Sequence, residues 1–134
     1  MLDDSRLNRY QLRCILLDVY NKMGLDVEVW AKIPGTVYAA STLGRVRNEN
    51  TGYILKPYSN KYCKYLRMPL WVKNTLLLKL VHYWLALSFI EPDANKPEID
   101  HINRNTVDNR LINLRRVTRL EQAGNKSITN ASRS

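Results

Sequence analysis

Cysteine is scarce in this chain, which has only Cys14 and Cys63 among its 134 residues. Two cysteines cannot supply a four-cysteine zinc site, and together with the two histidines they lack the usual spacing of a mixed zinc site. We therefore expect no structural zinc. Two reduced thiols are typical of a cytoplasmic protein, because disulfides are rare in that compartment.

The chain also lacks a hydrophobic run long enough to cross a bilayer. Its most apolar stretch, residues 76–90, is shorter than the roughly 20 residues of a membrane-spanning helix, and it contains Lys79 and His82. The N-terminus begins Met-Leu-Asp-Asp and shows no signal-peptide pattern. We expect no contact with a membrane and interpret residues 76–90 as a buried helix.

Acidic residues are few: 12 Asp and Glu stand against 21 Lys and Arg, for a net charge of +9. A compact protein with this charge repels itself unless it meets a polyanion, and nucleic acid is the usual one. The apolar share of 45% is that of an ordinary globular domain. The sequence therefore predicts a folded protein that binds nucleic acid.

The first part of an expected α+β protein is an N-terminal helix within residues 1–25. Asp3, Asp4 or Ser5 can cap its start, and Gly24 is a natural stop. The apolar residues at helical spacing are Leu12, Ile15, Leu16, Val19 and Met23. We expect this face to dock on the body of the protein; the alternative is that the arginines of the helix contact DNA.

Residues 26–74 are predicted to form a small β-rich module. Short alternating or β-branched segments are separated by turn signals such as Pro34-Gly35. The expected strands lie near residues 27–30, 36–38, 43–47 and 53–55, and residues 62–72 are expected to form another strand pair or hairpin. Arg45 and Arg47 flank Val46, so that a strand places both arginines on one face. We expect that face to lie along DNA phosphates; a solvated outer face is the alternative.

Residues 75–125 are predicted to hold the functional site. The helix of residues 76–90 is ended by Pro92, since proline disfavours helix at the preceding residue. A tail, residues 126–134, has no apolar pattern and is expected to be mobile.

A small ββα unit follows that helix. Residues 98–101 predict a short strand, residues 103–108 a polar loop and residues 111–117 a return strand. Thr118 and Glu121 form a capping-box pattern that starts a closing helix.

An acidic residue, Asp100, lies inside the most basic stretch and directly precedes His101. From His101 to Arg119 there are five arginines and one carboxylate. Asp100 repels DNA there unless a cation bridges the two, which predicts a metal ligand; an ion pair with a nearby arginine is the alternative. Histidine can take a proton from water near neutral pH. Neighbouring strand residues point to opposite faces, so both serve one site only if the chain twists or leaves the strand there.

Two amides complete the candidate site. Asn113, at the start of the return strand, is expected to bond backbone groups of the polar loop and so to fix His101. Gln122, in the first turn of the closing helix, offers an amide oxygen as a second metal ligand. Carboxylate and amide oxygens suit Mg or Mn better than zinc.

These segments resemble the HNH endonuclease family, in its phage- and intron-encoded homing branch. The resemblance rests on residues 82–90 (HYWLALSFI), 95–105 (NKPEIDHINRN), 108–118 (DNRLINLRRVT) and 121–122 (EQ). The upstream part resembles a short nuclease-associated module through residues 28–30 (EVW), 33–35 (IPG), Tyr38, 41–47 (STLGRVR) and 52–57 (GYILKP). Together the two patterns cover roughly residues 27–125.

The resemblance implies a ββα-metal (His-Me finger) core and hydrolysis of DNA with a single metal ion. In that family pattern His101 is the general base, Asp100 a metal ligand and Asn113 the residue that orients the histidine loop. The last ligand position, commonly Asn or His, falls on Gln122, whose side chain is one methylene longer than that of asparagine. Arg116 replaces the usual tryptophan of the return strand.

The sequence therefore predicts a metal-dependent HNH endonuclease, a phage homing or nicking enzyme that hydrolyses double-stranded DNA in the host cytoplasm. The alternative is a non-catalytic DNA-binding or accessory protein on a decayed HNH scaffold, which the Gln122 departure motivates. No pattern indicates a protein partner. The residues expected to contact DNA are basic and come from both parts of the chain: Arg45, Arg47, Lys56, Arg104, Arg110, Arg115, Arg116 and Arg119.

Overall fold

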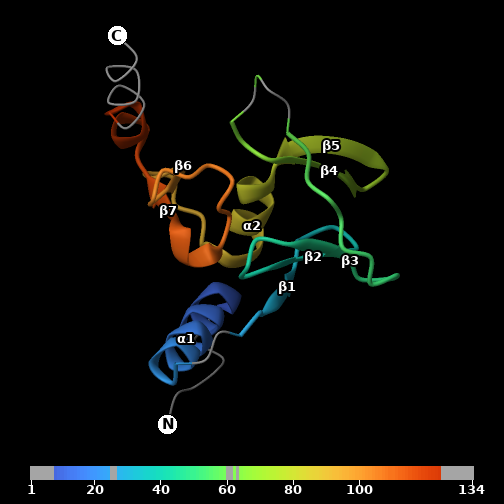
Figure 1. The fold of residues 1–134 in the computed structure, drawn as a ribbon, viewed down its shortest axis with the longest axis horizontal. Coiled ribbons are helices and arrows are strands. Elements are labelled where there is room, and N and C mark those ends of the chain that lie inside the picture. Colours follow the sequence, from blue (N-terminus) through green and yellow to red (C-terminus); the bar gives the residue numbers. More distant parts are fainter. Residues whose placement is uncertain (1–7, 25–26, 60–61, 63, 125–134) are drawn as a thin grey trace.

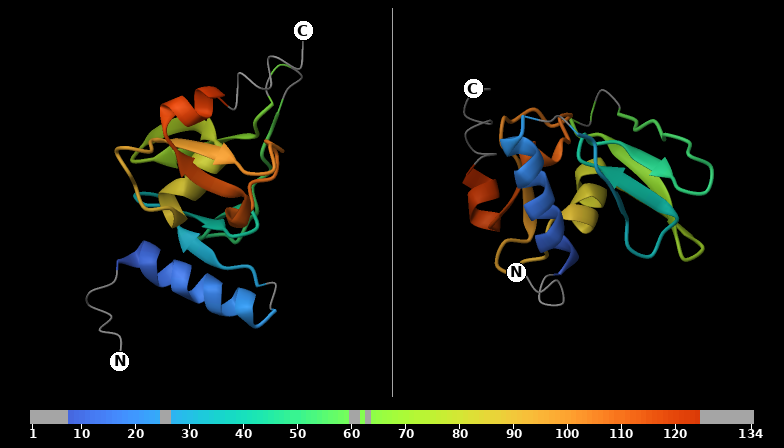
Figure 2. Two further views of the ribbon diagram at one scale, coloured as in Figure 1. Left: turned by 90° about the vertical axis from the view of Figure 1, so that its left-hand side faces the viewer. Right: turned by 90° about the horizontal axis from the view of Figure 1, so that it is seen from below.

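The computed structural model describes residues 8–24, 27–59, 62 and 64–124. Three small antiparallel sheets surround one central helix, α2 (Val81–Phe89), so the predicted α+β class is confirmed (Figure 1). Seen from below, the sheets of residues 30–80 lie on one side of α2, and the sheet of residues 98–117 lies on the other side together with the N-terminal helix (Figure 2). No helix in the described ranges has both the length and the apolar character needed to cross a bilayer.

The upstream module contains a three-stranded sheet. Its strands are β1 (Trp30–Lys32), β2 (Tyr38–Ser41) and β3 (Val46–Asn48), paired in the order β1-β2-β3. The central strand β2 is buried along its whole length. The strand expected at residues 53–55 is reduced to a single bridge between Arg47 and Ile54.

A second sheet is the hairpin of β4 (Arg67–Val72) and β5 (Thr75–Leu80). The prediction of helix at residues 76–80 was therefore wrong. A run of leucines suits a half-buried strand as well as a helix, and here pairing with β4 across a tight turn favours the strand. Lys73 and Asn74 have φ angles of 48° and 66°, as in the two-residue turns that match the twist of a hairpin. The boundary expected between residues 74 and 75 falls inside this hairpin.

The helix α2 supplies the centre of the core. Trp84, Leu85 and Phe89 are at most 2% exposed, and the Trp84 indole Nε1 donates to the Met68 carbonyl at 2.9 Å. The helix ends at Ile90, ahead of Pro92 as expected. Core residues from β1, β2, β3, β4, α2 and Leu114 form one continuous cluster. The upstream module and the ββα unit therefore share a single core.

The N-terminal helix α1 (Arg9–Lys22) begins later than expected. Asn8 caps it, and Asn8 and Gln11 form a capping box; Asp3, Asp4 and Ser5, the expected caps, lie outside the described residues. Gly24 follows the helix with a φ of +70°, as its predicted role as a stop requires.

The helix packs on the body, as expected, but not through the predicted face. Leu12, Ile15, Leu16, Val19 and Met23 are 37–65% exposed. Instead, the Tyr10 hydroxyl donates to the Leu87 carbonyl at 3.1 Å, and the Arg13 guanidinium donates to the Ser88 carbonyl. These carbonyls belong to the last turn of α2, where backbone acceptors have no partner inside the helix. Hydrogen bonds to these carbonyls therefore hold α1 against the end of α2.

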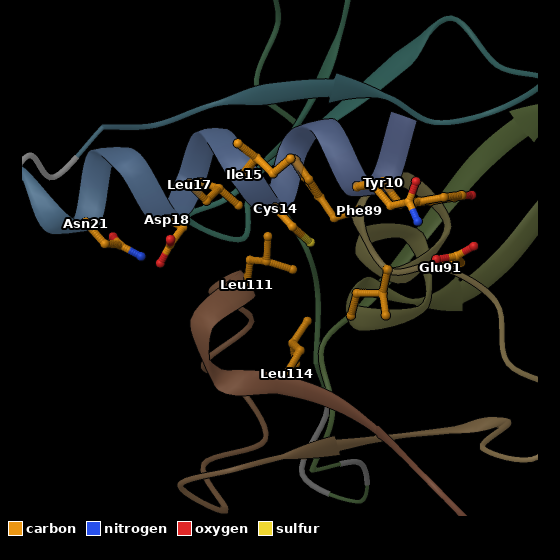
Figure 3. A pocket seen from close by; sticks show the side chains of 12 residues that line it. Tyr10, Cys14, Ile15, Leu17, Asp18, Asn21, Phe89, Glu91, Leu111 and Leu114 are labelled. Carbon is orange, nitrogen blue, oxygen red and sulfur yellow. The ribbon is translucent and has the colours of Figure 1, made fainter. Parts of the chain in front are cut away.

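A cleft of about 730 Å³ remains between α1 and the rest of the protein. Side chains of α1, among them Tyr10 and Cys14, line one side, and Leu111 and Leu114 line the other (Figure 3). The cleft lies apart from His101 and Gln122, which are not among its lining residues.

The ββα unit forms as predicted. β6 (Glu98–His101) pairs antiparallel with β7 (Leu114–Val117), and a short 3₁₀ turn, η2 (Leu111–Asn113), precedes β7. A helix begins at Arg119. Its capping box is present, because the Thr118 N–H donates to Glu121 Oε1 at 3.1 Å and the Glu121 N–H to Thr118 Oγ1 at 3.0 Å.

Candidate active site

His101 is the last residue of β6 and is 4% exposed. Its ring Nε2 lies 2.9 Å from Oδ1 of Asn109. An amide oxygen only accepts hydrogen bonds, so this contact places an imidazole proton on Nε2. No residue in the described ranges forms a hydrogen bond with Nδ1. In the neutral form of the ring, Nδ1 is therefore the nitrogen that can accept a proton.

Asn113 is the last residue of η2, and its side chain bonds three groups of the polar loop. Its Oδ1 accepts from the Asn103 N–H at 2.9 Å, and its Nδ2 donates to Asn103 Oδ1 at 2.9 Å and to the Asp108 carbonyl at 2.8 Å. The Asn113 carbonyl also accepts from the N–H of Ile102, the residue after His101, at 2.8 Å. Asn113 therefore bonds the loop backbone, and its link to the His101 ring is indirect.

A second histidine packs against the first. The ring centroids of His82 and His101 are 4.9 Å apart in an edge-to-face arrangement, and Tyr65 lies within 6 Å of both. His82 belongs to α2 and is 9% exposed. Burial and, to a lesser extent, the proximity of His101 lower the pKa of His82 from 6.5 to about 4. His82 is therefore neutral at pH 7.

Asp100 is 8% exposed and pairs with Arg115, its cross-strand neighbour. Oδ2 of Asp100 lies 3.0 Å from both Nε and a terminal nitrogen of Arg115. The ion pair that the sequence left open as an alternative is thus formed. It uses one carboxylate oxygen; Oδ1 accepts no hydrogen bond from the residues that the structure describes.

Gln122 lies beside the same strand. Its Nε2 donates to the carbonyl of Ile99, the residue before Asp100, at 3.4 Å. Its Oε1 is fully buried and has no hydrogen-bond partner within the described ranges. A buried amide oxygen without a partner is uncommon, because it has lost its hydrogen bonds to water and gains none from the protein. The donor set near β6 therefore contains one free carboxylate oxygen and one orphaned amide oxygen.

The polar loop itself is fastened by an ion pair. The Arg110 guanidinium donates two hydrogen bonds of 2.8 Å to the carboxylate of Asp108, and Asn103 donates a third at 2.9 Å. Chiefly through Arg110, these contacts lower the pKa of Asp108 well below its usual range. Arg104 lies in this loop with a φ of 63°, a region that non-glycine residues rarely adopt.

The arginines of the upstream sheet already form ion pairs with nearby carboxylates. Arg45 forms an ion pair with Glu28, and this contact lowers the pKa of the Glu28 carboxyl. Arg47 pairs with Glu49 at 3.0 Å. Both guanidinium groups also lie over the Trp30 ring, 5.4 and 4.1 Å from its centroid. Val46 is buried, so the predicted division of this strand into a basic and an apolar face is confirmed.

The remaining basic residues differ in whether they bind other groups of the protein. Arg116 donates to the Glu91 and Ile90 carbonyls at 2.7 and 3.2 Å and so joins β7 to the end of α2. Arg119 is 3.9 Å from Glu98. Lys56 and Arg104 are exposed and form no ion pair with any described residue.

Comparison with known proteins assigns two segments. Residues 28–71 match the model of the NUMOD4 motif, and residues 79–123 match that of the HNH endonuclease family. The chain thus contains a segment that matches the HNH endonuclease model, preceded by one that matches the NUMOD4 motif. No curated protein matches the chain.

Among solved structures, the chain is similar to the HNH homing endonuclease I-HmuI, described in a study of its DNA binding and cleavage. The TM-score is 0.65 at 27% sequence identity. The match covers 76% of this chain and 59% of that chain. Two fifths of the I-HmuI chain therefore have no counterpart in the alignment.

Sequence reasoning missed three residues at this site. Asn109, rather than Asn113, contacts the His101 ring. It belongs to a motif segment, but no neighbouring residue in the sequence indicates that it binds His101. His82 shares the inward face of α2 with Leu85 and Phe89, and its helical spacing from them was the available signal. Tyr65 offered none.

Proposed function

We propose that this protein is a divalent-metal-dependent DNA endonuclease that hydrolyses phosphodiester bonds of double-stranded DNA. The observation that carries the proposal is His101 with Nε2 held by Asn109, at the end of the strand that also bears Asp100. A homing or nicking role agrees with the similarity to I-HmuI. A phage origin stays a prediction of the sequence.

The residues present fit a hard divalent cation such as Mg or Mn. In the described part of the chain no three His, Cys, Asp or Glu side chains gather where they could hold an ion. The ligands would be Asp100 Oδ1 and Gln122 Oε1, neither of which accepts a hydrogen bond from a residue that the structure describes. Carboxylate and amide oxygens with remaining water ligands are usual for these ions. When bound, the cation would stabilise the charge that develops on the phosphate and the leaving oxygen.

The chain's own residues supply the proton transfer. Nδ1 of His101 accepts a proton from the attacking water, and Asn109 keeps the ring oriented while it becomes cationic. Neutral His82 adds no charge that opposes this step. Arg115 offsets the charge of Asp100 from the side away from its free oxygen.

Cleavage of supercoiled plasmid with Mg or Mn tests the proposal. We expect His101→Ala to slow cutting by about 10²- to 10⁴-fold, the usual contribution of a general base, with DNA affinity nearly unchanged. Leu120→Ala, at a side chain that is 83% exposed, is the matched control. A His101→Ala protein that cuts at the wild-type rate refutes the base assignment. Wild type that binds DNA but cuts with neither ion supports the non-catalytic alternative.

Gln122 is tested with a readout besides cleavage. Mn binding, followed by electron paramagnetic resonance or calorimetry, should weaken in Gln122→Ala and in Asp100→Asn and persist in Gln122→Asn, which keeps the amide oxygen. Equal Mn affinity in wild type and Gln122→Ala removes Gln122 from the ligand set.

Variants of two arginines distinguish a contact with DNA from a contact that stabilises the fold. Arg104 is exposed and forms no ion pair within the described part of the chain, whereas Arg116 is bound to two carbonyls. We expect Arg104→Ala to reduce the slope of log Kd against log salt by about 1, as the loss of one phosphate contact does, and Arg116→Ala to leave the slope unchanged while lowering stability. If Arg116→Ala reduced the salt slope and Arg104→Ala did not, the DNA-binding surface would include Arg116 and not Arg104.

A further inference from the structure

A glycine of the NUMOD4 segment lies against the loop that holds the candidate base. Gly44 ends the turn between β2 and β3 and has a φ of +89°. A Cβ atom built on Gly44 would lie 3.0 Å from both the carbonyl carbon and oxygen of Asn109 and 3.2 Å from its Cβ. The two nearest of these are backbone atoms, which cannot move aside as the end of a flexible side chain can. Only glycine fits here without displacing Asn109.

The turn that presents Gly44 is rigid. Ser41 is fully buried, and its Oγ accepts from the N–H groups of Leu43 and Arg45 at 3.2 and 3.1 Å. The Gly44 N–H donates to the Ser41 carbonyl at 3.0 Å. A side chain at position 44 would therefore press on Asn109 from a turn that these hydrogen bonds hold in place.

A second contact joins the same two segments. The N–H of Leu111 donates to the Thr42 carbonyl at 2.9 Å, and Thr42 is 7% exposed. The turn thus touches the chain at residue 109 and again at residue 111. Asn109 itself is 5% exposed and reaches the His101 Nε2 through its Oδ1.

We propose that the β2–β3 turn, residues 41–44, is a positioning element for His101 and acts through Asn109. This inference rests on the proposed function, in which His101 is the general base. The turn gives the NUMOD4 segment a part in catalysis that is separate from any contact of that segment with DNA. Gly44 is its positioning residue because the close approach of the two backbones depends on it.

The chain offers matched controls for this proposal. Gly35 and Gly52 also have positive φ angles, both +75°, but no atom lies within 4 Å of a Cβ built on either. Alanine at these two positions carries the backbone strain of a left-handed conformation without the clash. Alanine at position 44 carries both, so the difference isolates contact with Asn109.

Single-turnover cleavage at saturating DNA and metal gives the first readout. We expect Gly44→Ala to lower the cleavage rate roughly 10- to 100-fold, because displacements well below 1 Å impair proton transfer, with the Kd for DNA within about twofold of wild type. Gly35→Ala and Gly52→Ala should cut at close to the wild-type rate. In an Asn109→Ala background, Gly44→Ala should have little further effect, since the two changes act through one bond. A Gly44→Ala rate equal to that of Gly35→Ala, or additive losses in the double variant, overturns the proposal.

A readout without cleavage separates this proposal from the proposed function. A hydrogen-bonded imidazole N–H exchanges slowly with water and gives a downfield proton resonance, here assigned to His101 by its loss in His101→Ala. Wild type, Gly35→Ala and Gly52→Ala should show it, and Gly44→Ala and Asn109→Ala should not. Persistence of the resonance in Gly44→Ala refutes the positioning role even if the enzyme cuts DNA. Its loss there supports the role even if no cleavage is found.

Circular dichroism checks that each variant is folded. Should Gly44→Ala fail to fold, Gly44→Asn replaces it, because asparagine tolerates positive φ better than alanine while its Cβ meets the same atoms. The two outcomes above then apply to Gly44→Asn.

Discussion

His82 makes the stability of this protein depend on pH in a range where few other groups titrate. Its pKa falls from 6.5 to about 4 in the folded protein, mainly because the ring is buried. In the unfolded chain the ring is solvated and binds a proton below pH 6.5. Between pH 6.5 and 4 the unfolded state therefore binds a proton that the folded state does not, and stability falls as the pH is lowered.

The size of this effect follows from the two pKa values. The whole difference corresponds to about 3 kcal/mol, of which about 2 kcal/mol is lost between pH 7 and pH 5. For a domain with a total stability of about 5–15 kcal/mol, that is a large share. Below pH 4 the contribution of His82 levels off, and carboxylates such as Asp108, whose pKa is lowered by Arg110, take over the further decline.

Urea unfolding at pH 7, 6 and 5, followed by tryptophan fluorescence at constant salt, measures the effect. Trp84 is buried in the core and reports unfolding directly. In His82→Gln the decline between pH 7 and 5 should shrink by about 2 kcal/mol, with the urea m-value unchanged. The comparison variant His101→Gln keeps His82 buried and should retain most of the decline that His82 causes. Equal declines in wild type and His82→Gln refute the assignment.

Three further changes test local parts of the fold. Asn113→Ala should lower the free energy of unfolding by about 1–3 kcal/mol, because it leaves buried loop groups unpaired; urea titration measures this, and a loss below about 0.5 kcal/mol contradicts it. Thr118→Ala removes the cap of the closing helix and should cost about 0.5–2 kcal/mol; hydrogen exchange of that helix should quicken, and unchanged protection speaks against the capping contact. Lys73→Asn combined with Asn74→Gly suits the positive φ angles of the hairpin turn and should raise the melting temperature, whereas a lower one would show that the turn has another geometry.

The ββα unit followed from the sequence because its signals are local. The strand around Asp100, the turn residues after His101 and the capping box of Thr118 each depend on neighbours within a few positions. Such signals specify an element without knowledge of the rest of the fold.

The missed features depend on distant partners. Leu76 to Leu80 fits helix or strand by pattern alone, and pairing with β4 decides. α1 leaves its apolar stripe largely exposed, and hydrogen bonds to the body run from its Tyr10 and Arg13 to carbonyls at the end of α2. At the site, the segments of Gly44 and Asn109 are far apart in the sequence, and only the folded chain brings them into contact.

The shared core sets a limit on how such proteins can be rearranged. Ile33 and Val46 of the upstream sheet pack in one cluster with Trp84 and Leu114, so neither matched segment can bury its apolar residues alone. Both halves should melt in one cooperative transition. A hybrid made by grafting another nuclease's front half onto this back half would need compensating core residues before it could fold.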